Sequence, residues 1–512
     1  MSLTHRSMAA AAWSLGSVLT QACLQLTVMA VLARHIPPED FGLYAIVSMA
    51  LGMVAMFSEI GVRPAVVQHK DVCGRYVGMA FMLSLGLGGL AMALTWIAAP
   101  WVAAFFGQPQ VTGLLRATSV TLLISGYAAV AMALFERELH YRKLALIDVA
   151  SYTAGFGLVG IGLALRGAGV WAIVAATVSQ SLMRALLLAT TSRPIVRPKW
   201  SWRDLRDLVR FGAGLSAAQL FGYGASQADN AAVGRLIGPE ALGLYQMAFT
   251  IMDLPRRFLG IVVDQVMYAA MTRVQDDMAR LRTGYLQSLE VTTVVLLPVT
   301  VLAVVVAPEA VRGLLGERWS GAVLPAQILL TQVPLRASVR LSDSLGGAVG
   351  RVYRLAATKM LYALMVGVGA VAGARWGLEG VATAVTLVTV ANWLIMVRLA
   401  LQILQIPARD YWRAWLPGCL LSIVALVGAW PSITLMRLSA SPEVLRLGVT
   451  AATMACALFA VVWLWPQVLG SAALRLGLEL AKSAPLPERL SGYLQGVLDR
   501  GAHHCAKTPT RG

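Results

Sequence analysis

The stretch RHIPPEDFGLY at residues 34–44 returns as RLIGPEALGLY at residues 235–245. Seven of the eleven positions are identical, including the Pro-Glu pair and the closing Gly-Leu-Tyr. Pro-Glu and Gly-Leu-Tyr are ordinary turn and helix-start residues, but chance use of such residues would give fewer matches. The spacing therefore predicts two related halves, offset by 201 residues.

Outward from the repeat, the chain consists of long apolar runs separated by short charged breaks. Hydrophobic residues make up 58% of the chain and charged residues 13%, whereas a soluble domain has about 25% charged residues. Each run is long enough to cross ~30 Å of hydrocarbon as a helix. We predict an all-α polytopic membrane protein with about fourteen transmembrane helices. The predicted spans are 9–32, 41–62, 77–105, 113–135, 144–165, 168–190, 211–233, 242–265, 289–307, 322–342, 356–374, 377–397, 413–435 and 446–468.

The basic residues that give the chain its net charge of +17 gather in alternate loops. This alternation is typical of cytoplasmic loops and argues against nucleic-acid binding. It predicts a multi-pass protein of the bacterial inner membrane with both termini in the cytoplasm. The predicted cytoplasmic loops are 63–75, 137–143, 193–210, 273–282, 351–359 and 398–413.

Both copies of the repeat join the first and second helix of a predicted six-helix unit. An even number of helices in each unit predicts a parallel repeat, with its pseudo-twofold axis along the membrane normal. We expect an N-lobe at 1–200, a C-lobe at 201–405, an added helix pair at 406–468 and a cytoplasmic amphipathic tail at 469–512. The tail either lies on the membrane surface or packs on the protein's own loops.

Motifs for soluble chemistry are missing from the sequence. It contains no P-loop, no HExxH zinc motif and no nucleophile elbow. The five cysteines form no CxxC pair. We therefore expect no catalytic residues, no cofactor and no metal, and we predict that the chain is not an enzyme.

Charge inside the membrane is the remaining signal, and it is strongest in IMDLPRRFLG at 251–260. Such charges are costly and face a partner or a water-filled cavity. Asp253 lies three residues before Arg256 and four before Arg257, so it can pair with one of them on the same helix face. The other guanidinium is then a candidate receptor for phosphate. The alternative is that both arginines reach the cytoplasmic interface.

Other intramembrane charges are candidates for substrate or ion contacts. Arg63 and Arg336 are further candidate substrate-binding residues, Arg336 lying with Arg340 near the end of span 322–342. Asp229, Glu59 and Asp253 are candidate ion-coupling residues. The alternative for each is a structural salt bridge or an interface anchor.

These motifs resemble a known family. LARHIPPEDFGLYAIVSM (32–49), GVRPAVVQHKD (61–71), DNAAVGRLIGPEALGLYQMAF (229–249) and LLPVTVLAVVVAPEAVRGLLGERW (296–319) are similar to the polysaccharide transporters of the Wzx type. The resemblance covers roughly residues 10–400. It implies membership of the multidrug/oligosaccharidyl-lipid/polysaccharide exporter superfamily, with two six-helix lobes around a cationic cavity.

The resemblance implies a flippase for lipopolysaccharide, capsule or exopolysaccharide biosynthesis. It would move a polyprenyl-diphosphate-linked oligosaccharide from the cytoplasmic to the periplasmic leaflet by alternating access. Membrane lipid and the lipid-linked glycan would be its partners, and a polysaccharide polymerase is a further candidate. In related peptidoglycan-precursor flippases, helices 13 and 14 form a groove for the lipid tail.

Two other functions compete with this interpretation. A cation-coupled drug antiporter of the same superfamily would show more acidic than basic residues in its cavity. A membrane polysaccharide polymerase or ligase usually needs a large external loop, whereas the longest external loop expected here is 308–321.

Overall fold

The computed structural model describes residues 21–58, 63, 66–67, 74–138, 140–191, 222–224, 226–253, 277–438 and 442–464. All regular structure in these ranges is helical. The α-helices are α2 (Pro38–Ser58), α4 (Gly74–Phe106), α5 (Gln110–Arg137), α6 (Tyr141–Tyr152), α7 (Ile161–Ala164), α8 (Val170–Thr191), α10 (Ala228–Leu236), α12 (Met278–Ala310), α13 (Val323–Leu330), α14 (Val333–Ala348), α15 (Val352–Gly373), α16 (Gly377–Leu404), α17 (Ala408–Leu438) and α18 (Glu443–Leu464). Residues 21–35 and 239–253 are also helical.

Local sequence explains where several helices begin and end. Pro38 opens α2, where its missing N–H is not needed, and two acidic residues follow it in the first turn. Asp277 caps α12 by accepting hydrogen bonds from the backbone N–H groups of Ala279 and Arg280, both at 3.1 Å. Gln405 adopts a left-handed φ of 51° and ends α16.

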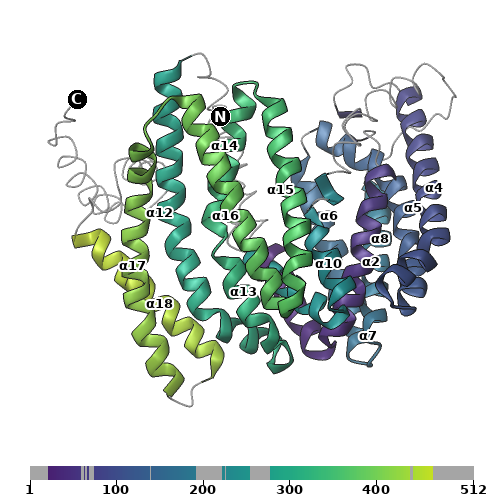
Figure 1. The fold of residues 1–512 in the computed structure, drawn as a ribbon. Coiled ribbons are helices and arrows are strands. Elements are labelled where there is room, and N and C mark those ends of the chain that lie inside the picture. The colour runs from purple at the N-terminus through teal and green to yellow at the C-terminus, as the bar shows by residue number, and fades with distance from the viewer. Residues whose placement is uncertain are drawn as a thin grey trace, which may run out of the picture. The chain divides into compact units, whose positions relative to one another are not determined.

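The chain divides into two compact units, Met1–Gln246 and Met247–Gly512. In the first unit, α4 packs along α5, and α8 packs against both α5 and the π-helical turn Thr153–Gly160 that continues α6. In the second unit, α12 packs along α17, α15 along α16, and α18 along α17 (Figure 1). The predicted lobe boundary near residue 200 stays a prediction.

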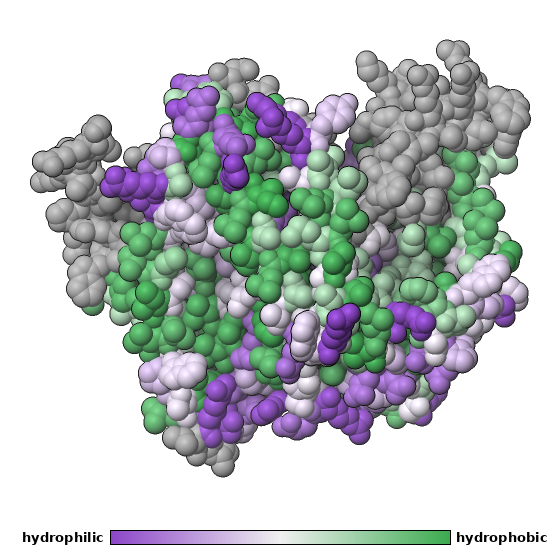
Figure 2. Space-filling model, viewed as in Figure 1, coloured by the Kyte–Doolittle hydropathy of each residue, from purple (hydrophilic) through white to green (hydrophobic). Residues whose placement is uncertain are grey.

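Nine helical stretches of the described residues are long and apolar enough to cross a membrane. The longest, Tyr353–Leu404, contains two predicted spans joined by the short 3-10 helix Ala374–Trp376. Hydrophobic side chains cover the middle of α15, α16 and α17, with hydrophilic ones at their ends (Figure 2). The all-α, multi-pass class is thus confirmed, and the total of fourteen helices stays a prediction.

The two copies of the repeat touch each other inside the first unit. A β-carbon on Gly42 would overlap the carbonyl oxygen of Pro239, and one on Gly243 would overlap the carbonyl oxygen of Pro38. Because equivalent residues make equivalent contacts, this crossing has local twofold pseudosymmetry. The close backbone approach requires glycine at both positions, which explains why these positions match in the repeat.

Candidate functional site

A polar break divides the helical stretch that corresponds to predicted span 322–342. α13 ends at Leu330 and α14 begins at Val333, leaving Thr331 and Gln332 between them. The Gln332 side chain is fully buried. Its Nε2 donates to the Thr386 hydroxyl at 2.7 Å, and its Oε1 accepts from the Thr389 hydroxyl at 3.1 Å. Gln332 is therefore held rigidly against α16.

Gln332 in turn positions Arg336. The Nε of Arg336 donates to Gln332 Oε1 at 3.0 Å, and its guanidinium lies over the Phe249 ring at 5.6 Å. Among the described residues, the two terminal guanidinium nitrogens have no hydrogen-bond partner. This half-buried guanidinium presents its fork to an incoming group, and phosphate oxygens match that geometry.

The position of Arg336 differs from the predicted one in one respect. We expected it near the end of its helix, but α14 continues to Ala348. The polar residues Ser338 and Ser342 on this helix find partners in Tyr411 and Tyr285, at 2.8 and 2.9 Å. Because these hydroxyls are satisfied, the helix stays stable past the predicted boundary. Arg336 thus lies in the first turn of α14, near the opposite end of the helix from the one that we expected.

Asp229 lies at the start of α10 and is buried with 3% of its surface exposed. Tyr245, the last residue of the second repeat copy, donates its hydroxyl to Asp229 Oδ2 at 3.1 Å. Asn230 is also buried and donates to Gln227 Oε1 at 2.6 Å. The side-chain oxygen of Asn230 has no partner among the described residues. Together these groups bring several oxygen atoms into one buried place.

The first repeat copy lacks this polar group. Tyr44, the equivalent of Tyr245, bonds the Thr177 hydroxyl at 2.7 Å. The position equivalent to Asp229, 201 residues earlier, is Val28 in a hydrophobic cluster. The two repeat copies thus differ at this position, because the second copy has a buried carboxylate, Asp229, where the first has the apolar Val28.

Arg63 forms an ion pair within the first unit. Its guanidinium binds both carboxylate oxygens of Glu136 in α5, the Nε contact measuring 2.8 Å. Nearby, Arg184 of α8 pairs with Asp148 of α6 at 2.9 Å, and Arg63 also acts electrostatically on Asp148. Arg63 therefore belongs to a network of two arginines and two carboxylates, with part of its side chain exposed.

The remaining predicted site residues are only partly covered by the structure. Asp253 is the last described residue of helix 239–253 and is half-buried. Its predicted partners Arg256 and Arg257, and the candidate Glu59, lie outside the described residues. The structure thus places the Arg336 guanidinium over the ring of Phe249. Phe249 lies on helix 239–253, which precedes Arg256 and Arg257 in the chain.

Sequence reasoning missed three of the partners described above: Gln332, Glu136 and Tyr245. Tyr245 belongs to the second repeat copy, and a hydroxyl within an apolar helix could have predicted a buried polar partner such as Asp229. Gln332 was the central polar side chain of a predicted span. Glu136 gave no signal, since it lies 73 residues from Arg63 along the chain.

Comparison with known proteins identifies the family. A family model described as "Polysaccharide biosynthesis protein" matches residues 31–324, more than half of the chain. The chain belongs to this family. The predicted resemblance to polysaccharide transporters is thereby confirmed.

Named relatives of this family member come from several bacteria. Teichuronic acid biosynthesis protein TuaB of Bacillus subtilis (strain 168) is 24% identical over 478 residues, covering 91% of this chain and 97% of that protein. Lipopolysaccharide biosynthesis protein WzxC of Escherichia coli (strain K12) is 25% identical, covering 66% and 69%. Succinoglycan biosynthesis transport protein ExoT of Rhizobium meliloti (strain 1021) is 27% identical, covering 60% and 62%.

Solved structures share the fold of this polysaccharide biosynthesis protein. The lipid II flippase MurJ, in an inward closed conformation, superposes with a TM-score of 0.69 at 12% identity, covering 87% of this chain and 98% of MurJ. An inward-facing multidrug resistance transporter of the MATE family and MOP superfamily gives 0.62 at 16% identity, covering 74% and 94%. The predicted superfamily fold is confirmed.

Proposed function

We propose that this protein moves a polyprenyl-diphosphate-linked oligosaccharide from the cytoplasmic to the periplasmic leaflet of the bacterial inner membrane. Transport proceeds by alternating access and supplies repeat units for a surface polysaccharide. The family and relatives named for lipopolysaccharide and succinoglycan synthesis support this proposal, and the fold is shared with a lipid II flippase. The chain carries the glycan and catalyses no bond change.

The observation that carries the proposal is the Arg336 guanidinium. Holding a cation inside membrane-spanning helices costs at least ~2.5–3.5 kcal/mol near the bilayer centre, so an anionic ligand is its natural counterpart. A diphosphate supplies two charged groups of the geometry that a guanidinium binds. Arg256 and Arg257 are proposed to contact the same diphosphate, and Arg63 stays a candidate substrate-binding residue. A cationic drug would be repelled by this arrangement.

The proposal is tested by deleting the gene and analysing the lipid-linked glycans. Cells without the protein should accumulate a polyprenyl-diphosphate-linked repeat unit on the cytoplasmic side and lose the surface polymer. Purified protein in liposomes should expose the same labelled lipid to an enzyme added outside. Normal polymer in the deletion strain, or ethidium-like dye export without glycan transport, would point to the antiporter alternative.

Topology gives a separate prediction. The alternation of basic loops predicts that both termini and the loop 191–210 lie in the cytoplasm. Reporter fusions after Pro194 and after Ala506 should therefore both give a cytoplasmic signal. A periplasmic signal at either site would contradict the fourteen-helix topology.

Energy coupling is proposed to involve Asp229. A driving ion must bind the inward- and outward-open forms with different affinity. The buried carboxylate of Asp229, next in the chain to Asn230 with its buried side-chain oxygen, suits a small cation or a proton. Asp229→Asn should fold but lose the response of transport to an imposed ion gradient in vesicles. Glu59 and Asp253 are the next candidates.

The control for Asp229 is Tyr245→Phe. This variant removes the hydroxyl that donates to the carboxylate but leaves the charge, so gradient-driven transport should persist at a reduced level. If Asp229→Asn transports with an unchanged response to collapsing the gradient, the coupling role is wrong. Loss of folded protein in both variants would instead indicate a structural role.

A further inference from the structure

A proline inside α4 leaves one backbone carbonyl without its usual helical donor. Pro100 lies in the interior of α4 and has no N–H. The carbonyl of Trp96, four residues earlier, therefore lacks the hydrogen bond that an α-helix normally provides. Arg116 of α5 replaces this donor, with its Nε 3.3 Å from the Trp96 carbonyl oxygen. Pro100 thus creates an attachment point for an arginine of the neighbouring helix.

The indole ring of Trp96 contacts the same guanidinium. The Arg116 Cζ lies over the ring, 4.3 Å from its centroid, which is a cation–π distance. Among the described residues, Arg116 has no ion pair, and its two terminal nitrogens have no hydrogen-bond partner. The guanidinium is therefore held in place by Trp96, while its charge is not neutralised and its fork is open to a ligand.

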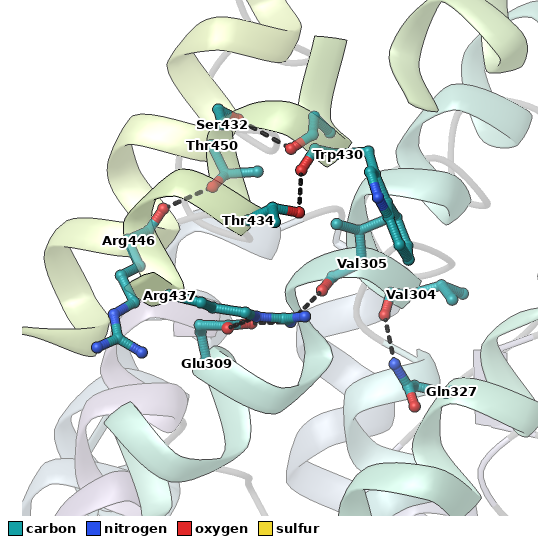
Figure 3. A network of polar contacts seen from close by, with 11 residues as sticks. Val304, Val305, Glu309, Gln327, Trp430, Ser432, Thr434, Arg437, Arg446 and Thr450 are labelled. Atoms are coloured by element: carbon teal, nitrogen blue, oxygen red, sulfur yellow. Dashed lines mark hydrogen bonds and ion pairs between the residues drawn. The ribbon is translucent and has the colours of Figure 1, made fainter. Parts of the chain in front are cut away.

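Arg437 shows how an arginine beside membrane-spanning helices is neutralised within the chain. It binds Glu309 with two hydrogen bonds, at 2.7 Å from Nε to Oε1 and at 3.1 Å from Nη2 to Oε2 (Figure 3). Nη2 also donates to the Val305 carbonyl at 3.3 Å. Arg116 has no such carboxylate in the part of the chain that the structure describes. An anion from outside the chain is therefore its natural counterpart.

The surface beside Arg116 is apolar. Exposed hydrophobic side chains of α4 recur at spacings of three and four, and therefore share one face of the helix: Leu90, Leu94, Ile97 and Trp101. Trp96 is 50% exposed and adjoins this face next to Ile97. A ligand that matches both features has an anionic group and a long apolar part, as a membrane lipid does.

The depth of Arg116 along its helix suits a lipid headgroup. Arg116 lies roughly 9 Å along α5 from the first residue, Gln110. The charge pattern predicts that this end of α5 is periplasmic. An arginine near the end of a spanning helix reaches the interface, where the phosphates of phospholipids lie, and its fork matches two phosphate oxygens.

We propose that Arg116 and Trp96 form a binding site for the phosphate of an anionic phospholipid in the outer leaflet. The terminal nitrogens of Arg116 donate to the phosphate oxygens, and the Trp96 carbonyl and ring hold the guanidinium in place. An acyl chain lies along the apolar face of α4. The site is built entirely from the first unit, and it does not depend on the proposed transport function.

The test measures lipid binding to the purified full chain. After delipidation, phosphatidylglycerol is titrated and counted by native mass spectrometry. Arg116→Gln should weaken the tightest binding by about tenfold or more, the effect of losing a hydrogen bond to a charged group. The matched control Arg166→Gln removes the same charge from an exposed position of the same unit, on the same predicted side, and should bind as the wild type does.

Two variants of Trp96 separate the ring from the charge. Trp96→Leu keeps an apolar side chain and the backbone carbonyl but removes the ring under the guanidinium, so it should bind phosphatidylglycerol less tightly than the wild type. Trp96→Phe keeps an aromatic face and should retain most of the binding. Wild-type binding by Trp96→Leu would contradict the assigned role of the ring.

A measurement on the wild-type chain avoids any folding defect of the variants. An arginine-selective reagent is applied with and without phosphatidylglycerol, and peptide mapping should show that the lipid protects Arg116 but not Arg166. Equal modification of Arg116 with and without lipid, or equal loss of binding in Arg116→Gln and Arg166→Gln, would overturn the proposal. Equal protection by inorganic phosphate would indicate a free-anion site, and displacement of the lipid by polyprenyl phosphate would indicate a substrate site; either result overturns the phospholipid assignment.

Discussion

Replacing Arg336 with glutamine is expected to lower export of the lipid-linked glycan by about 10- to 100-fold, the range that loss of a hydrogen bond to a charged group produces. The protein should still insert and fold. Glutamine keeps a polar side chain near Gln332, whose bonds to Thr386 and Thr389 are independent of Arg336. The loss thus isolates the guanidinium charge. Export is measured as surface polymer in cells and as lipid exposure in liposomes, with each variant normalised to the amount of folded protein.

Arg336→Lys separates charge from geometry. Lysine keeps the charge but cannot reproduce the fork or the bond from Nε to Gln332, so export should be partial if charge dominates and nearly absent if the bidentate geometry dominates. Arg375→Gln, an exposed arginine of the same unit, serves as the control and should export normally. Full export by Arg336→Gln would remove this residue from the substrate path.

The membrane-spanning helices could be predicted from sequence because lipid imposes a simple rule. A spanning segment must satisfy its backbone internally and present about twenty apolar residues, so composition alone reports it. Thus span 77–105 corresponds to α4, and span 113–135 to α5. The repeat could be predicted because Gly42 and Gly243 meet at one crossing and obey the same steric limit.

The partners of the intramembrane charges could not be predicted, because packing decides them. Arg63 meets Glu136 across 73 residues, and Arg437 meets Glu309 across 128. No local spacing encodes such pairs. The same holds for Gln332, whose role depends on two threonines that α16 brings to it. The sequence selected the candidate charges, and the tertiary structure distinguished Arg336 from Arg63 and Arg437, which are engaged in ion pairs.

Gly42→Ala combined with Gly243→Ala is expected to abolish transport and lower the apparent Tm. Each β-carbon would overlap a backbone carbonyl, of Pro239 or of Pro38, and a backbone cannot rotate aside as a side chain can. Overpacking of this kind costs about 1–3 kcal/mol at each site. The two helix starts that carry Gly42 and Gly243 must therefore move apart, and their close backbone contact is lost.

The control exploits two helical glycines with open surroundings. A β-carbon added to Gly86 or Gly162 would meet nothing within 4 Å. Gly86→Ala/Gly162→Ala should therefore export normally and gain slightly in stability, since alanine favours a helix by about 0.5–1 kcal/mol over glycine. Each single variant at the crossing should retain more activity than the double, because one glycine still permits partial approach. A double variant with normal export and unchanged Tm would show that the two repeat copies need not touch during transport.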